Sequence, residues 1–228
     1  MHQTRLAGAL GVFTVFRSLA LFSQAVGYEA DRNPLGLTSD VILERLAKMN
    51  ICIALFRGIN VGGKNSLPMK ELVDILEEIG CQNVKTYIQS GNVVFKINDK
   101  NISGLSDYLR VEIKKRRGFA PFVLLLSRTD LEKIAANNPF PEVQNDPQAL
   151  HVGFLAAVPT QPDLKRLESL REKNERFQLI NNAFYLHAPN GIGRSKLAAN
   201  TEKLLGVSMT DRNWRTVGKI LDMVKELD

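Results

Sequence analysis

The order in which strand and helix patterns alternate restricts the fold of this chain more than any other feature of its sequence. Residues 51–56 are continuously apolar, which predicts a central β-strand. From residue 68 to residue 79 apolar side chains recur at helical spacing, with Pro68 in the first turn and Gly80 after the end. Strand patterns then cover residues 84–89, 92–97 and 121–127, and helix patterns cover residues 103–116 and 130–136. The order β-α-β-β-α-β predicts a ferredoxin-like unit.

The second half of the chain repeats this order in part. Three prolines, Pro139, Pro141 and Pro147, mark a loop and the best internal boundary. After it come a strand at residues 150–158, a helix at 162–174, a hairpin at 177–180 and 184–187, and helices at 195–205 and 213–227. No last strand is recognisable, which leaves open that the second unit is a shortened version sharing its core with the first. We therefore predict an α+β protein of two packed ferredoxin-like units, residues 49–137 and 148–228.

Residues 1–48 are predicted to be an N-terminal extension outside these units. The stretch from residue 6 to residue 26 is mostly apolar, but Arg17 lies in its middle, which argues against a membrane span. Arg17 also spoils a signal-peptide pattern with Arg5 ahead of the apolar run. Because Met49 runs directly into the first strand, we favour Met49 as the domain start. The extension would then be a leader, a mis-assigned start or a disordered tail.

Composition favours a basic protein without a metal centre. The formal net charge is +6 and the isoelectric point about 9.4, a balance that favours anionic partners. Cys52 and Cys81 make no disulfide framework in a chain of this length, and we expect both to be packing residues. His2, His151 and His187 lack metal-ligand spacing. We expect a cytoplasmic protein with no metal, no cofactor and no membrane partner, and we leave its oligomeric state open.

Two glycine-rich loops ahead of helices are the best candidates for a ligand site. The opening loop, residues 57–65, carries three glycines with basic and amide side chains, and residues 191–196 repeat this pattern. Glycine lets the main chain approach a ligand closely, and a helix N-terminus attracts anions. Neither loop has the spacing of a P-loop or of the G-x-G-x-x-G dinucleotide pattern. The sequence therefore indicates anion binding without a known nucleotide motif.

Catalytic machinery is not recognisable. No Ser-His-Asp or Cys-His arrangement has spacing that supports nucleophilic catalysis. Asp211 and Glu71 are the acids near the polar loops, and both lie where carboxylates serve at helix termini. The catalytic residues therefore stay unassigned, and binding is at least as well supported as catalysis.

Four motifs together resemble one bacterial family, catalogued as domain of unknown function 1697. They are Arg-Gly-Ile-Asn-Val-Gly-Gly-Lys-Asn at residues 57–65, Tyr-Ile-Gln-Ser-Gly-Asn-Val-Val-Phe at 87–95, Gly-Arg-Ser-Lys-Leu at 193–197 and Thr-Asp-Arg-Asn-Trp-Arg-Thr-Val at 210–217. The resemblance implies a compact cytoplasmic α+β protein of two ferredoxin-like parts with no assigned activity. The recurrent polar positions of the family fall here on Arg57, Asn60, Lys64, Ser90, Asn92, Arg194, Ser195, Lys196, Arg212, Asn213 and Arg215.

Two hypotheses follow for these eleven residues. In the first, the basic loops bind an anionic ligand, either a phosphate-bearing small molecule or a nucleic-acid segment, in a shared hollow. In the second, the chain is a structural or protein-interaction module, and the polar motifs tie the two units together. The glycines that lead into helices, and Ser195 and Thr210 as plain helix N-caps, are consistent with the second hypothesis.

Overall fold

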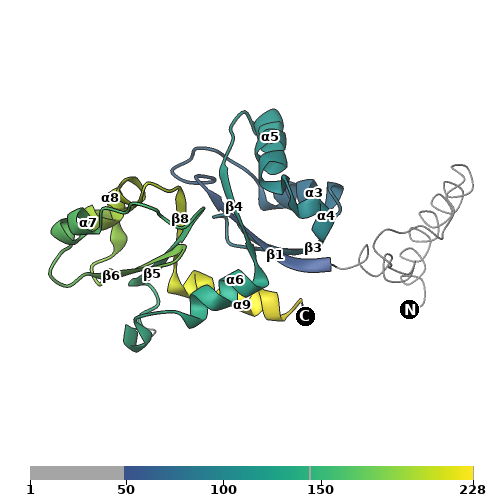
Figure 1. Cartoon of the computed structure of the whole chain (residues 1–228). Coiled ribbons are helices and arrows are strands. Elements are labelled where there is room, and N and C mark those ends of the chain that lie inside the picture. The colour runs from purple at the N-terminus through teal and green to yellow at the C-terminus, as the bar shows by residue number, and fades with distance from the viewer. Residues whose placement is uncertain (1–48, 144, 228) are drawn as a thin grey trace, which may run out of the picture. The chain divides into compact units, whose positions relative to one another are not determined.

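The computed structural model describes residues 49–143 and 145–227, which belong to one compact unit of the chain (Figure 1). The predicted N-terminal extension, residues 1–48, lies outside the described residues, so the prediction about it stays a prediction. Among the described residues, no helix is long and apolar enough to cross a membrane.

The first half folds as the alternation of strand and helix patterns predicts. Its elements are β1 (Met49–Arg57), α3 (Met69–Glu78), β2 (Gln82–Tyr87), β3 (Asn92–Asn98), α4 (Asp99–Ile102), α5 (Leu105–Arg117), β4 (Phe122–Ser127) and α6 (Arg128–Ala136). The four strands form one sheet in the order β2-β3-β1-β4, with every neighbouring pair antiparallel. This strand order is that of a ferredoxin-like unit.

The second half is a complete unit of the same kind. Its elements are β5 (Leu150–Leu155), α7 (Leu164–Leu170), β6 (Arg176–Ile180), β7 (Ala183–His187), α8 (Lys196–Leu205), β8 (Met209–Asn213) and α9 (Trp214–Lys225), with short 3-10 turns η1 (Pro141–Val143) and η2 (Ile192–Arg194). The sheet order β6-β7-β5-β8 matches that of the first half, again with antiparallel neighbours.

The strand β8 corrects the expectation of a shortened second unit. Its sequence is Met-Thr-Asp-Arg-Asn, in which Met209 is the one apolar residue, so no hydrophobic alternation indicates a strand. The inward positions are Thr210 and Arg212, and both are buried. Hydrogen bonds of these polar side chains take the place of apolar packing, and pattern reading therefore missed the strand.

Both faces of each sheet are covered, which explains the continuous apolar run of β1. Ile53 and Leu55 face a central core, whereas Cys52, Ala54 and Phe56 face a second core that includes α3 and α5. The central core collects residues of both sheets together with α6 and α9, which lie side by side (Figure 1). A third core packs the other face of the second sheet against α7 and α8.

The two halves therefore share their largest core instead of standing as separate globules. Val217, Ile220 and Val224 of α9 are buried in it. A buried hydrogen bond of 2.6 Å from the Tyr185 hydroxyl of β7 to the Ile134 carbonyl of α6 adds a polar tie between the halves. Burial raises the pKa of this tyrosine to about 12, so the hydroxyl stays a donor at neutral pH.

Gly91, in the turn between β2 and β3, tests this packing. A methyl group here would lie 2.5 Å from Phe56 Cβ and 2.7 Å from Ile59 Cδ1, and the backbone φ is +73°. Gly91→Ala is expected to lower the free energy of unfolding by about 2–5 kcal/mol, because overpacking adds to left-handed strain. Urea denaturation of the purified protein measures this difference.

Gly104 is the matched control, because its φ is +78° and no atom lies within 4 Å of the position that an added methyl group would take. Gly104→Ala is expected to cost only the conformational strain, about 1 kcal/mol. Equal losses in the two variants would show that contact with Phe56 and Ile59 does not matter.

Candidate functional site

In the opening loop, Asn60 is fully engaged in holding the loop itself. Its amide nitrogen donates to the carbonyl of Leu67 at 2.8 Å and to that of Gln89 at 2.9 Å. Its amide oxygen accepts from the Leu67 backbone N–H at 2.8 Å. The φ of +52° suits asparagine, which tolerates the left-handed region better than most residues. The polar atoms of Asn60 are therefore used by the fold.

Lys64, at the tip of the same loop, is in the opposite situation. A bridge between Val61 and Lys64 closes the tip, and the Lys64 backbone N–H donates to the Val61 carbonyl at 3.1 Å. The Lys64 side chain is exposed, and among the described residues it has no hydrogen bond or ion pair. Its ammonium group is therefore available to a ligand.

Arg57, at the start of the opening loop, contacts the second half of the chain. Its Nη1 lies 2.6 and 2.7 Å from the two carboxylate oxygens of Glu202 on α8, and 2.7 Å from the Met209 carbonyl at the start of β8. The guanidinium also lies 4.9 Å from the ring centroid of Phe122. Because both ionic side chains are about two-fifths exposed, the ion pair itself contributes little more than about 1 kcal/mol. Its main effect is to fix the position of the loop.

Arg212 of β8 makes the most heavily bonded contact between the halves. Its Nη2 donates to the Phe56 carbonyl at 2.6 Å and to the Ser90 carbonyl at 3.3 Å, and its Nε donates to the Asn92 side-chain oxygen. Nη1 donates to Thr210 Oγ1 at 2.8 Å, and the residue is 9% exposed. Burial lowers the pKa of Arg212 to about 10, so the guanidinium remains charged at neutral pH.

Asn92 completes this arrangement from the first half. It is fully buried, and its amide nitrogen donates to the Tyr87 carbonyl at 3.2 Å and to Ser90 Oγ at 2.9 Å. Two groups of polar side chains thus join the halves, the Arg57–Glu202 pair and the set of Ser90, Asn92 and Arg212, and we call the five residues together the polar seam. In the seam, four of the eleven predicted site residues bind other parts of the same chain.

Two further predicted residues act as helix caps. Ser195 is the N-cap of α8, where its hydroxyl oxygen accepts from the Ala198 N–H at 3.0 Å. Asn213 is the N-cap of α9, where its side-chain oxygen accepts from the Thr216 N–H at 2.9 Å. An N-cap satisfies a backbone donor that the helix leaves unpaired. These contacts explain both residue types without a ligand.

The remaining predicted cations stay exposed. Arg194 ends η2, Lys196 begins α8, and Arg215 lies in the first turn of α9. Within the described part of the chain, none of the three side chains has a hydrogen bond or an ion pair. With Lys64, they form the part of the predicted site that the fold does not use.

The structure brings the opening loop to the later part of α8, because Glu202 is the contact of Arg57. Lys196 lies six residues earlier in this helix, a rise of about 9 Å along its axis. The three cavities described for residues 49–143 and 145–227 are lined by none of the eleven predicted residues. A single hollow shared by the two glycine loops therefore stays a prediction.

Sequence reading missed a buried histidine–aspartate contact. His151 Nδ1 lies 2.8 Å from an Asp211 carboxylate oxygen, and Nε2 lies 3.0 Å from the Gln148 carbonyl. These residues are 60 positions apart in the sequence, so only the pairing of β5 with β8 brings them together. Because both ring nitrogens face oxygen atoms of the protein, neither is open to a substrate. The contact has no visible catalytic partner among the described residues, and it supports the second sheet.

The duplicated ferredoxin-like architecture and the polar seam define the class of this protein, a two-unit α+β protein with a buried arginine between its halves. The chain belongs to the family described as "Protein of unknown function (DUF1697)", which matches residues 49–185. The match includes the opening loop and the β2–β3 turn and ends before Arg194.

A solved structure supports the assignment of the fold. The conserved bacterial protein SP0830 from Streptococcus pneumoniae is 27% identical, with a TM-score of 0.58, and the alignment covers 78% of this chain and 99% of that protein. A search of the curated proteins finds no match. These comparisons support the fold and the family, and the description of SP0830 names no ligand or activity.

The polar seam makes a direct prediction about stability. Arg212→Met would leave the Phe56 carbonyl and the Asn92 side-chain oxygen buried without their charged donor. We expect the free energy of unfolding to fall by at least about 2 kcal/mol. Urea denaturation measures this loss. Arg215→Met, which removes an arginine that is exposed and unpaired within the described residues of α9, is the control and should stay within about 0.5 kcal/mol of the unsubstituted protein. Similar small effects in both variants would contradict a structural role of Arg212.

Proposed function

We propose that this protein binds an anionic ligand, either a phosphate-bearing small molecule or a nucleic-acid segment, through the exposed cations of its two glycine loops. The binding residues are Lys64 in the opening loop with Arg194 and Lys196 at the start of α8. The observation that carries the proposal is that these cations have no partner among the described residues, although they stand beside motif residues that are fully bonded. A cytoplasmic location is part of the same proposal.

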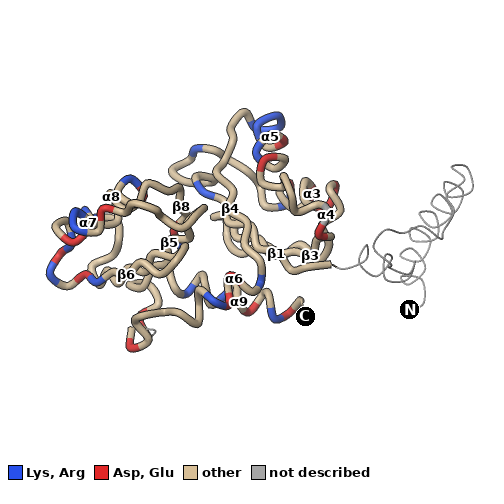
Figure 2. Tube along the Cα trace, viewed as in Figure 1, with Lys and Arg blue, Asp and Glu red and all other residues tan. Residues whose placement is uncertain are grey.

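The contrast with other basic residues supports this choice. A run of cations stands out at the end of α5 (Figure 2). There, however, Arg116 pairs with Glu78 and Glu112, and Arg117 pairs with Glu71. Basic residues that mainly serve solubility or helix stability usually lie among acids in this way. The glycine-loop cations have no such ion pair within the described part of the chain. Lys203 has none either, so it is their position on or beside the glycine loops that selects Lys64, Arg194 and Lys196.

The position of the opening loop along α8 is compatible with an extended ligand. Arg57 fixes the opening loop at Glu202, while Lys196 lies about 9 Å away along the helix axis. Phosphates of a single nucleic-acid strand repeat about every 3.4 Å along the axis of a duplex, so a few nucleotides span this interval. A polyphosphate group of comparable length would also reach.

A second candidate is a structural or protein-interaction module, and the polar seam is the observation that favours it. Arg57, Asn92 and Arg212 all bond across the two halves, and Asn92 and Arg212 are buried. The two candidates assign different residues, since the seam explains the bonded members of the motifs and leaves the exposed cations unexplained. Variants of the exposed cations therefore separate them.

Binding is tested by fluorescence anisotropy of a labelled ten-nucleotide single strand at several salt concentrations, and by thermal shift with nucleoside triphosphates and sugar phosphates. For the oligonucleotide, affinity should fall steeply with salt, and Lys64→Gln, Arg194→Gln or Lys196→Gln should each reduce the slope of log K against log salt by about 0.7. A small phosphate ligand would instead raise the melting temperature by binding the folded protein.

Lys203→Gln is the matched control, because Lys203 is an exposed residue of the last turn of α8 with no partner among the described residues. It should bind like the unsubstituted protein. No binding of any probe at millimolar concentration, or equal losses in Lys203→Gln and in the three loop variants, would refute a specific site at the glycine loops.

A further inference from the structure

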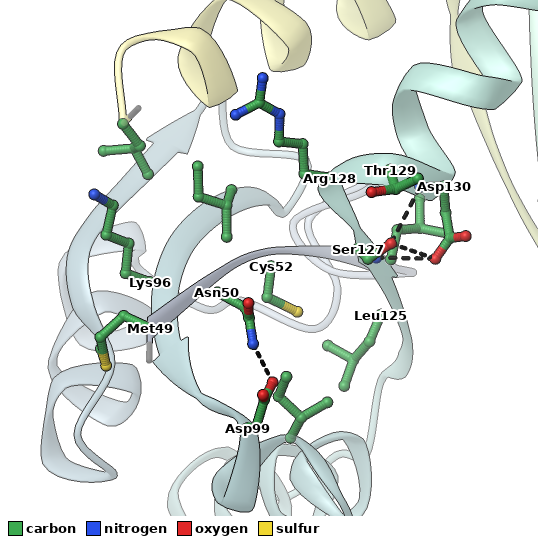
Figure 3. A pocket seen from close by; sticks show the side chains of 14 residues that line it. Met49, Asn50, Cys52, Lys96, Asp99, Leu125, Ser127, Arg128, Thr129 and Asp130 are labelled. Atoms are coloured by element: carbon green, nitrogen blue, oxygen red, sulfur yellow. Dashed lines mark hydrogen bonds between the residues drawn. The ribbon is translucent and has the colours of Figure 1, made fainter. Parts of the chain in front are cut away.

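A cavity of about 640 Å³ opens at the end of the first sheet, away from the residues of the proposed anion site. It arises because β1 is longer than its neighbour β4. β1 pairs with β3 from Met49 onward, but it pairs with β4 only from Cys52, where Ser127 ends β4 and α6 begins. The first three residues of β1 therefore have β3 on one side and line the cavity where β4 has ended (Figure 3).

The inner surface of this cavity is mainly apolar. Ile51, Leu125 and Leu126 contribute from the strands, Ile102 from α4, and Leu227 from the end of the chain. Cys52 also lines it, and burial raises the pKa of its thiol to about 12, so the thiol is an unreactive packing group. A cavity of several hundred Å³ with an apolar lining and a few polar groups is typical of a small-molecule site.

The acids at its rim already have partners within the fold. Asp99 accepts a hydrogen bond from the Asn50 side chain. Asp130 closes a capping box with Ser127, whose hydroxyl donates to it at 2.7 Å. Both contacts are drawn in Figure 3. Neither carboxylate therefore needs a cation from elsewhere.

Lys96 is different, because its half-buried side chain lines the cavity and has no hydrogen bond or ion pair among the described residues. It lies opposite Ile51 in the sheet, so its aliphatic stem continues the apolar lining while its ammonium group marks one side. A partly buried ammonium beside apolar surface favours an anionic group that arrives with an apolar body.

We propose that this cavity binds a small molecule with an apolar body and a single anionic head group, which pairs with Lys96. The body would displace water from the leucine and isoleucine surface, and that transfer is the main source of affinity. None of Lys64, Arg194 and Lys196 lines this cavity, so failure of one proposal leaves the other untouched.

Decanoate and its uncharged counterpart decanol serve as probes with the full chain, below the concentration at which decanoate forms micelles. Decanoate should raise the melting temperature in a saturable manner, and isothermal titration calorimetry should give a single site. Decanol should bind at least tenfold more weakly, a difference of about 1.4 kcal/mol. Lys96→Met, which keeps the length and removes the charge, should weaken decanoate at least tenfold and leave decanol unchanged.

Thr129→Trp tests the location, because Thr129 is an exposed residue of the rim and a larger side chain there fills the cavity without entering the core. It should abolish decanoate binding, whereas Lys203→Met should have no effect. Melting curves of each variant without ligand verify folding. The proposal is overturned if decanoate fails to bind, if decanol binds equally well, or if Thr129→Trp binds decanoate like the unsubstituted protein.

Discussion

The buried guanidinium of Arg212 is the interaction on which the arrangement of the two halves depends. It donates to the ends of β1 and of the β2–β3 turn while standing in β8. A buried charge is costly unless nearly every donor finds an acceptor. Arg212 meets this condition only when the second sheet lies in one position against the first, because its Nε and Nη2 acceptors, on Phe56, Ser90 and Asn92, belong to the first half. The apolar central core would tolerate small displacements of one half against the other, whereas this set of directional bonds would not.

The central core holds the two halves together, and the polar seam fixes their relative position. Each half has the same strand order and is followed by one additional helix, α6 or α9. Those two helices and the inner faces of both sheets share one cluster of buried residues. Because burial of apolar area is not directional, this core holds the halves together without choosing a register between them. Polar side chains make this choice, which explains why sequence motifs rich in arginine and asparagine lie at the junction.

How far the sequence predicts this structure depends on what each segment buries. The first unit was predictable, because residues 51–56 and the helix of Leu72 and Leu76 bury apolar side chains with the expected periods. β8 was not, since Thr210 and Arg212 replace the apolar positions of a strand. For the site, the sequence identified the polar residues but not their roles. Asn60 and Ser195 were recognisable as loop and cap residues, but the cap expected at Thr210 is formed by Asn213, because Thr210 lies inside β8. The partners of Arg57 and Arg212 lie more than 100 positions away, and a local pattern contains no sign of them.

The polar seam also helps to hold the loops that carry the exposed cations. A protein can present Lys64 and Lys196 to one extended anion only if the interval between their loops is constant. The Arg57–Glu202 contact anchors the opening loop to α8, and the Ser195 cap anchors the other loop to the start of the same helix. Because an α-helix rises by a fixed distance for each residue, the two anchoring points on α8 have a constant separation. Under the binding proposal the bonded and the free residues of the motifs have complementary roles, because the bonded ones hold the loops that carry the free ones. The structural hypothesis and the binding hypothesis then describe two parts of one arrangement, and the exposed cations decide whether that arrangement has a ligand.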